Sequence, residues 1–127
     1  MVKWRSSMTT TQLTGMRGEE AAVAYLSAER YDVRERNARF GRLEIDIIAY
    51  DRAEKMIVFV EVKTRSRHTA AYPIHTAVDV RKRRAMRAAM WRWVIANDFG
   101  GAGRIDVISV SSDRIVEHIK DLGSDFY

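Results

Sequence analysis

The chain has 127 residues, a length that suits one domain with one core, and its hydrophobic fraction of 46% excludes a globally disordered protein. It has no cysteine, which excludes disulfides and cysteine-ligated zinc and fits a reducing cytoplasm. Lysine and arginine number 22 against 17 acidic residues, so a polyanionic partner such as nucleic acid is favoured, although a basic surface kept for solubility explains the charge equally well. The longest uninterrupted apolar run, residues 56–60, is too short to cross a membrane, which takes ~20 residues.

The sequence predicts a flexible arm over residues 1–11 and a single domain over residues 12–127. Helical periodicity covers residues 12–30 and 76–97, and the second of these segments ends before a glycine-rich break. Strand patterns follow the first helix at 31–40, 43–50 and 56–64, and the second helix at 104–110 and 114–119. The order α-β-β-β-α-β-β predicts an α/β fold with a mixed sheet flanked by helices.

The strongest chemical signal lies in the strand 56–64. Side chains in a strand alternate between its two faces, and one face of this strand is wholly apolar. The other face begins apolar and ends with the carboxylate of Glu61 and the amine of Lys63. A face of this kind is core at one end and a candidate functional site at the other.

The preceding strand carries a second acid, Asp46. By the same alternation, Asp46 shares a face with Ile48, and the opposite face is lined by Leu43, Ile45 and Ile47. If the two strands pair in antiparallel fashion, Asp46 lies near Glu61, and three or four ionisable groups share one patch.

These residue types suit metal-dependent hydrolysis. Asp46 and Glu61 offer the hard oxygen ligands that Mg²⁺ or Mn²⁺ prefers, and the backbone carbonyl of Val62 offers another. Lys63 can orient the attacking water and offset charge on a scissile phosphate, so phosphodiester hydrolysis uses all of these parts. A bare Glu-x-Lys is common and is usually a solvated strand end with ion pairs. Here the apolar strand before it and the preceding Glu-Ile-Asp favour a site.

Several motifs also occur with the order and spacing of a known family. These are Gly15-Met16-Arg17-Gly18-Glu19, Glu44-Ile45-Asp46, Val60-Glu61-Val62-Lys63 and Arg104-Ile105-Asp106-Val107. Over residues 13–110 the chain resembles the PD-(D/E)xK nuclease superfamily of restriction endonucleases and Holliday-junction resolvases. Within that superfamily it is most similar to the bacterial YraN family.

The resemblance implies a restriction-endonuclease-like fold and a set of roles. Asp46 and Glu61 match the metal-binding acids of the superfamily, and Lys63 matches its catalytic lysine. Glu19 matches a helix glutamate that supplements the metal site in resolvase-like members. The implied activity is Mg²⁺- or Mn²⁺-dependent cleavage of DNA, with branched or otherwise structured DNA as a candidate substrate. A homodimer is implied by analogy with resolvases that cut two strands.

The second predicted helix is strongly basic. Its candidate contacts to phosphate are Lys82, Arg83, Arg84 and Arg87. One acid, Asp79, can pair with Arg83 at i,i+4, which is the solvated-face explanation. Arg39 and Arg65 are further candidate DNA contacts outside the helix. Trp91 and Trp93 lie beside the cations, and we expect one of them in the core and the other available to stack on a base.

Two alternatives to a nuclease stay open. One is a nucleic-acid-binding module of the same fold with little or no turnover, and the other is an interaction protein whose basic helix docks an acidic partner. Leu43 and Tyr72 stand where the resembled family has glycines, which leaves the shape of the substrate cleft open. Arg104 and Asp106 share a strand face and are expected to form a structural ion pair near the sheet edge.

Overall fold

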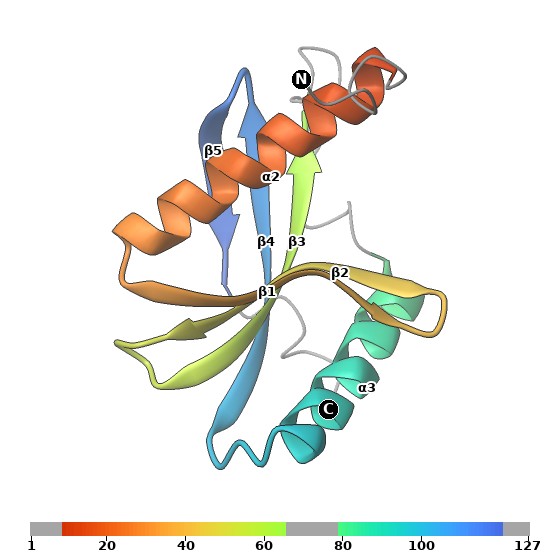
Figure 1. Cartoon of the computed structure of the whole chain (residues 1–127), viewed down its shortest axis with the longest axis vertical. Coiled ribbons are helices and arrows are strands. Elements are labelled where there is room, and N and C mark those ends of the chain that lie inside the picture. Colours follow the sequence, from red (N-terminus) through yellow and green to blue (C-terminus); the bar gives the residue numbers. More distant parts are fainter. Residues whose placement is uncertain (1–8, 66–78, 121–127) are drawn as a thin grey trace, which may run out of the picture.

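The computed structural model describes residues 9–65 and 79–120 of the chain. The elements follow the predicted order α-β-β-β-α-β-β (Figure 1). They are α2 (Thr10–Ala28), β1 (Tyr31–Phe40), β2 (Leu43–Asp51), β3 (Met56–Thr64), α3 (Val80–Ala96), β4 (Ala102–Ser111) and β5 (Arg114–Ile119). No helix in this described part is long and apolar enough to span a membrane.

The five strands form one mixed sheet in the order β1-β2-β3-β4-β5. Every neighbouring pair is antiparallel except β3 and β4, which run parallel and are connected through α3. The sheet is strongly twisted, so β1 and β2 run at a steep angle to β4 (Figure 1). The predicted α/β class with a mixed sheet is confirmed.

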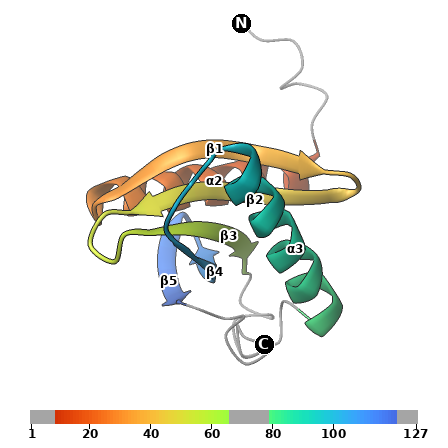
Figure 2. The ribbon, with the colours of Figure 1, turned by 90° about the horizontal axis from the view of Figure 1, so that it is seen from below.

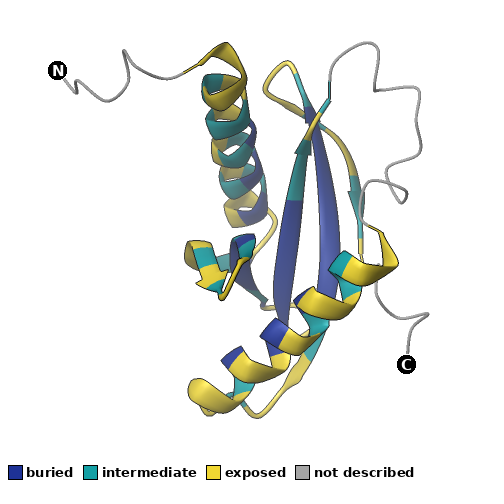
Figure 3. Cartoon of the chain, turned by 90° about the vertical axis from the view of Figure 1, so that its right-hand side faces the viewer, coloured by how far each residue is buried: buried dark blue, intermediate teal, exposed yellow. Residues whose placement is uncertain are grey.

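The two helices cover opposite faces of this sheet (Figure 2). α2 packs Ala22 and Leu26 against one cluster of buried strand residues, and α3 packs Met86, Met90 and Trp93 against another. Figure 3 shows the central strands in dark blue between the buried faces of both helices. β3 and β4 are therefore covered on both faces, which is why both are almost continuously buried.

Both helices begin at a side-chain cap. Thr9 caps α2 with a capping box, in which the Thr9 hydroxyl accepts from Gln12 N and the Gln12 side chain accepts from Thr9 N. The helix therefore begins at Thr10, two residues before the predicted start, because Thr9 rather than a later threonine is the cap. Asp79 caps α3 by accepting from Lys82 N, so its carboxylate serves the helix end.

The predicted ion pair between Arg104 and Asp106 is present, but its expected place near the sheet edge was wrong. β4 lies inside the sheet between β3 and β5, and both side chains are buried. Arg104 also donates to Asp51 and to the Tyr31 hydroxyl, and His118 Nε2 lies 2.7 Å from Asp106. Among the described residues, every buried side-chain nitrogen or oxygen has a hydrogen-bond partner, so the buried charges are compensated.

Candidate functional site

The candidate site lies where β2 and β3 separate. The two strands pair from Asp51↔Met56 to Ile47↔Val60, and the pairing stops before Asp46 and Glu61. The Asp46 carboxylate then accepts a hydrogen bond from the backbone nitrogen of Val62 at 2.7 Å. A side chain thus satisfies a β3 donor beyond the last strand pair, and it fixes Asp46 beside Glu61. The predicted proximity of these two acids is confirmed.

The backbone is also irregular on the other side of Asp46. β1 pairs Arg36 with Ile47 and Ala38 with Ile45, but the intervening Asn37 is not paired with Asp46. Asn37 has a φ of 52°, in the left-handed region that is uncommon for residues other than glycine. Asp46 therefore lies at a local break in both ladders of β2.

This break changes which faces the β2 side chains occupy. Strict alternation predicts Ile45 and Ile47 on one face, with Ile48 on the other. Instead, Ile45 and Ile48 share the cluster under α3, and Ile47 belongs to the cluster under α2. The predicted alternation was wrong at Asp46, because the strand switches faces where its ladder is interrupted.

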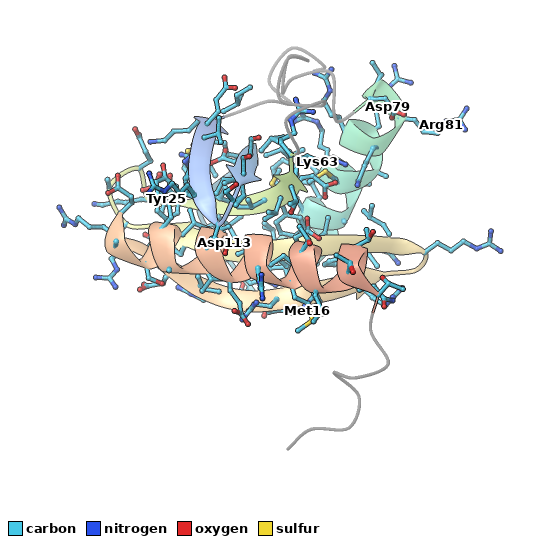
Figure 4. The ribbon with its side chains drawn as sticks, turned by 90° about the horizontal axis from the view of Figure 1, so that it is seen from above. Met16, Tyr25, Lys63, Asp79, Arg81 and Asp113 are labelled. Carbon is cyan, nitrogen blue, oxygen red and sulfur yellow. The ribbon has the colours of Figure 1, made fainter. Side chains whose placement is uncertain are left out.

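Glu61 is held by two lysines. Its side chain is 5% exposed, and its Oε2 lies 3.2 Å from Lys63 Nζ and 2.5 Å from Lys82 Nζ. Lys63 comes from the same strand, whereas Lys82 reaches in from the first turn of α3. Figure 4 shows Lys63 at the end of β3, on the side of the sheet where α3 begins. From the sequence, Lys82 was predicted only as a phosphate contact on the basic helix. In the structure it also forms an ion pair with buried Glu61.

The site perturbs the ionisation of Asp46. Burial, followed by the negative charge of Glu61, raises the pKa of the Asp46 carboxyl to about 7, against the opposing hydrogen bond from Val62 N. The Asp46 and Glu61 carboxyls are also close enough to share a hydrogen bond. A half-buried and a buried acid that lie this close repel each other when both are ionised, and a bound cation relieves such repulsion.

Glu19 joins this site electrostatically from α2. It is half-buried, and burial is the largest cause that raises the pKa of its carboxyl. The charge of Glu61 raises that pKa further, and Glu19 in turn raises the pKa of Asp46. Arg36 and a hydrogen bond with Asn37 oppose the increase. The predicted helix glutamate thus lies on the side of α2 that faces the two metal-ligand candidates.

The donor set suits a hard divalent cation. Asp46, Glu61, Glu19 and the carbonyl of Val62 could supply oxygen ligands, and Mg²⁺ commonly takes only one or two protein carboxylates, with waters and substrate phosphate completing its shell. Over residues 9–65 and 79–120, no three His, Cys, Asp or Glu side chains lie close enough to form a ready-made cage. The chemistry therefore fits an open site with the pair Asp46 and Glu61 at its centre.

The other predicted DNA contacts come from β1, the end of β3 and α3. Arg39 is exposed and pairs with Glu44 at 3.1 Å, which uses its guanidinium locally. Arg65 follows β3, and its backbone nitrogen donates to Val110 O. On α3, Arg84 is exposed, and Arg83 and Arg87 are half-buried. A basic surface therefore continues from Lys82 along α3, and Figure 4 shows Arg81 projecting outward at its start.

The two tryptophans of α3 divide as predicted. Trp93 is buried against the sheet, and its Nε1 donates to the Glu35 carboxylate. Trp91 is 49% exposed on the outer side of the helix, among the cations. Two residues two positions apart on a helix cannot both face the same sheet, so only one of them is core.

Comparison with known proteins places the chain in a family. A family model described as "Uncharacterised protein family UPF0102" matches residues 18–110. The chain belongs to the UPF0102 family. This family is the YraN family, so the resemblance to a PD-(D/E)xK nuclease-like family is confirmed.

The UPF0102 match extends to individual proteins along most of their length. A UPF0102 protein of Myxococcus xanthus is 42% identical over 111 residues, covering 83% of this chain and 84% of that protein. A UPF0102 protein of Geobacter metallireducens is 36% identical over 112 residues, which cover 88% of this chain and 90% of that protein. The shared segment includes Glu19, Asp46, Glu61 and Lys82, because all four lie within residues 18–110.

Proposed function

We propose that this UPF0102 protein is a Mg²⁺- or Mn²⁺-dependent endonuclease that hydrolyses phosphodiester bonds in DNA, with branched or structured DNA as the candidate substrate. The observation that carries the proposal is the fork between β2 and β3. There half-buried Asp46 lies beside buried Glu61, and the ammonium groups of Lys63 and Lys82 contact Glu61. Neighbouring acids can hold a divalent cation, and neighbouring lysines can balance charge on a phosphate. Metal-dependent phosphodiester hydrolysis uses both kinds of group.

Each residue has a separate task in this proposal. Asp46 and Glu61 would hold the cation, with Glu19 and the Val62 carbonyl as further oxygen donors. A bound Mg²⁺ or Mn²⁺ supplies Lewis acidity and acidifies a bound water. Lys63, at the exposed end of the same strand face, orients the attacking water and balances negative charge that grows on the scissile phosphate. Val62 N keeps Asp46 in place by its hydrogen bond.

The basic face of α3 supports DNA as the polymer that reaches this site. Lys82 links that face to Glu61, so a phosphate chain that follows α3 arrives at the acids. Phosphate contacts of this kind give affinity without sequence information, which suits an enzyme directed at DNA structure.

A second candidate is a nucleic-acid-binding module without turnover. The contact that favours it is again Lys82, because an ammonium on Glu61 already neutralises one of the acids. The two candidates predict the same DNA affinity but different responses to metal. An interaction protein that docks an acidic partner through α3 would instead bind no polynucleotide.

The proposal is tested with linear, single-stranded, flapped and four-way DNA in Mg²⁺, Mn²⁺ or chelator. We expect metal-dependent products from the wild type and none from Glu61→Gln. Glu54→Gln is the matched control, because Glu54 is an exposed acid in the turn between β2 and β3. Binding without products on every substrate and in either metal would reject the enzyme and leave the binding module. Equal products from wild type and Glu61→Gln would point to a contaminating nuclease.

A further inference from the structure

A second feature lies beside the fork, on the face of the sheet covered by α2. A cavity of about 510 Å³ opens between the first turns of α2, the end of β3 and the turn between β4 and β5. Its lining includes Gly15, Arg17, Gly18, Thr64, Arg65 and Asp113. Figure 4 shows Asp113 over the sheet-facing side of α2, whereas Met16 points to the opposite side.

The lining has the composition of a nucleotide site. Gly18 and Val110 are buried and form an apolar floor with Gly15, against which a base or sugar can pack. The guanidinium groups of Arg17 and Arg65 are suited to a phosphate. The volume lies within the range of small-ligand pockets and accommodates one nucleotide rather than a duplex.

The lining also carries one acid, Asp113. Asp113 is on the β4–β5 turn, and its carboxylate disfavours a phosphate at that end. It can accept a hydrogen bond from the amine or ring N–H of a base instead. A nucleotide in this cavity would therefore place its phosphate on a guanidinium group and a base N–H on the Asp113 carboxylate.

The cavity is adjacent to the catalytic candidates in the chain. Thr64 and Arg65 directly follow Lys63, and Gly18 directly precedes Glu19. α2 and β3 touch where an added Cβ on Gly18 would lie 2.4 Å from Thr64 Oγ1. Consecutive residues of α2 and of β3 therefore contribute to the cavity and to the fork.

We propose that this cavity binds a single nucleotide of the substrate strand, unpaired and adjacent to the scissile phosphate. The inference rests on the proposed nuclease function, and it names the substrate class of that site as DNA with an unpaired or extruded nucleotide. A fully paired duplex cannot deliver a base into a cavity of this size without extruding it.

Gly15 allows a direct test, because an added Cβ there meets nothing within 4 Å while the residue lines the cavity. An added Cβ has room there, so Gly15→Leu is expected to extend into the cavity, and leucine also improves helix propensity. Ser27→Leu places the same side chain on an exposed position of the same helix and is the matched control. Affinity for fluorescein-labelled (dT)₁₀ is measured in chelator, so that no cleavage or metal binding enters the result.

We expect Gly15→Leu to weaken (dT)₁₀ binding at least ~tenfold, the scale for losing one seated base, with Gly15→Ala intermediate and Ser27→Leu at the wild-type affinity. Thymidine 5′-monophosphate should shift the amide resonances of Gly15, Gly18 and Ser112, and inorganic phosphate at the same concentration should not shift Ser112. Equal affinity of Gly15→Leu and Ser27→Leu for (dT)₁₀ would overturn the proposal that the cavity binds a nucleotide. The absence of a nucleotide-induced shift at these amides would overturn it as well. Either result leaves metal-dependent cleavage untouched, and absence of cleavage leaves the binding result standing.

Discussion

The close approach of α2 to β3 makes Gly18→Ala an informative perturbation. An added Cβ on Gly18 lies 2.4 Å from Thr64 Oγ1 and 3.6 Å from Thr64 Cβ. Alanine gains about 1 kcal/mol of helix propensity over glycine, and the same gain applies at Gly15, where nothing lies within 4 Å. Gly15→Ala and Gly18→Ala are therefore a matched pair in one helix, and they differ only in what the new methyl group meets.

The clash at Gly18 can be relieved in two ways. Thr64 can rotate its hydroxyl away, which costs about 1 kcal/mol when the new χ1 is unfavourable in a strand. Otherwise α2 moves off the sheet, and overpacking of this kind costs about 1–3 kcal/mol. We expect Gly15→Ala to stabilise the protein by about 1 kcal/mol and Gly18→Ala to be less stable than Gly15→Ala by about 1–3 kcal/mol.

Urea unfolding followed by circular dichroism measures both variants. The same pair of substitutions in a Thr64→Ala background completes a double-mutant cycle, because Thr64→Ala removes the Oγ1 atom that the new methyl group would contact. In the Thr64→Ala background, Gly18→Ala should stabilise the protein as much as Gly15→Ala does. If Gly18→Ala is as stabilising as Gly15→Ala in the wild-type background, or if the cycle gives a coupling below about 0.5 kcal/mol, the close packing of α2 on Thr64 is refuted.

Four further outcomes follow from the site and its surroundings. Mn²⁺ should raise the melting temperature of the wild type by relieving repulsion between buried acids, and Asp46→Ala, compared with its own metal-free state, should lose that increase in differential scanning fluorimetry. Lys63→Ala should keep Mn²⁺ affinity by calorimetry while cleavage falls roughly a hundredfold, whereas a silent module would have no cleavage to lose. Arg84→Gln should make the log–log salt dependence of duplex binding shallower by about 0.9, and an unchanged slope would remove Arg84 from the DNA surface. Asp51 has a lowered pKa because hydrogen bonds from the turn and Arg104 outweigh its burial, so its stabilisation is full above about pH 4 and is lost as pH falls through the folded-state pKa. The free energy of unfolding, measured as a function of pH, should therefore fall less steeply at acidic pH in Asp51→Asn than in the wild type.

The order of elements could be predicted because it depends on local patterns. Residues 43–50 and 56–64 alternate or run apolar, and the two helical segments carry a 3.6-residue period, so their type is fixed before any tertiary contact forms. The helix starts depend on finer chemistry. Thr9 and Asp79 are the caps that the structure uses, and several nearby threonines could have served as well as Thr9. The sequence therefore predicts the helices better than their first residues.

The site was predictable only in part. Asp46, Glu61 and Lys63 stand out because ionisable residues interrupt two largely apolar strands, but their contacts with α2 and α3 depend on packing. Lys82 is 21 residues from Glu61, and no local pattern indicates that it reaches a buried carboxylate rather than solvent. The cavity likewise combines three separate segments of chain. One sequence feature does indicate the close packing of α2 on β3, because a glycine inside a helix, here Gly18, often marks the close approach of another backbone or side chain.

The interruption of β2 at Asp46 gives a physical reason for the position of the site. In a regular ladder the backbone donors of neighbouring strands bond to the carbonyl groups opposite, and no side-chain acceptor is needed. Where β2 and β3 separate, Val62 N needs an acceptor, and the Asp46 carboxylate provides one. That bond holds the acid in a fixed direction beside Glu61 although mutual repulsion and burial both disfavour its charge. Strand separation thus places an acid with a pKa of about 7 where a cation or proton can stabilise it.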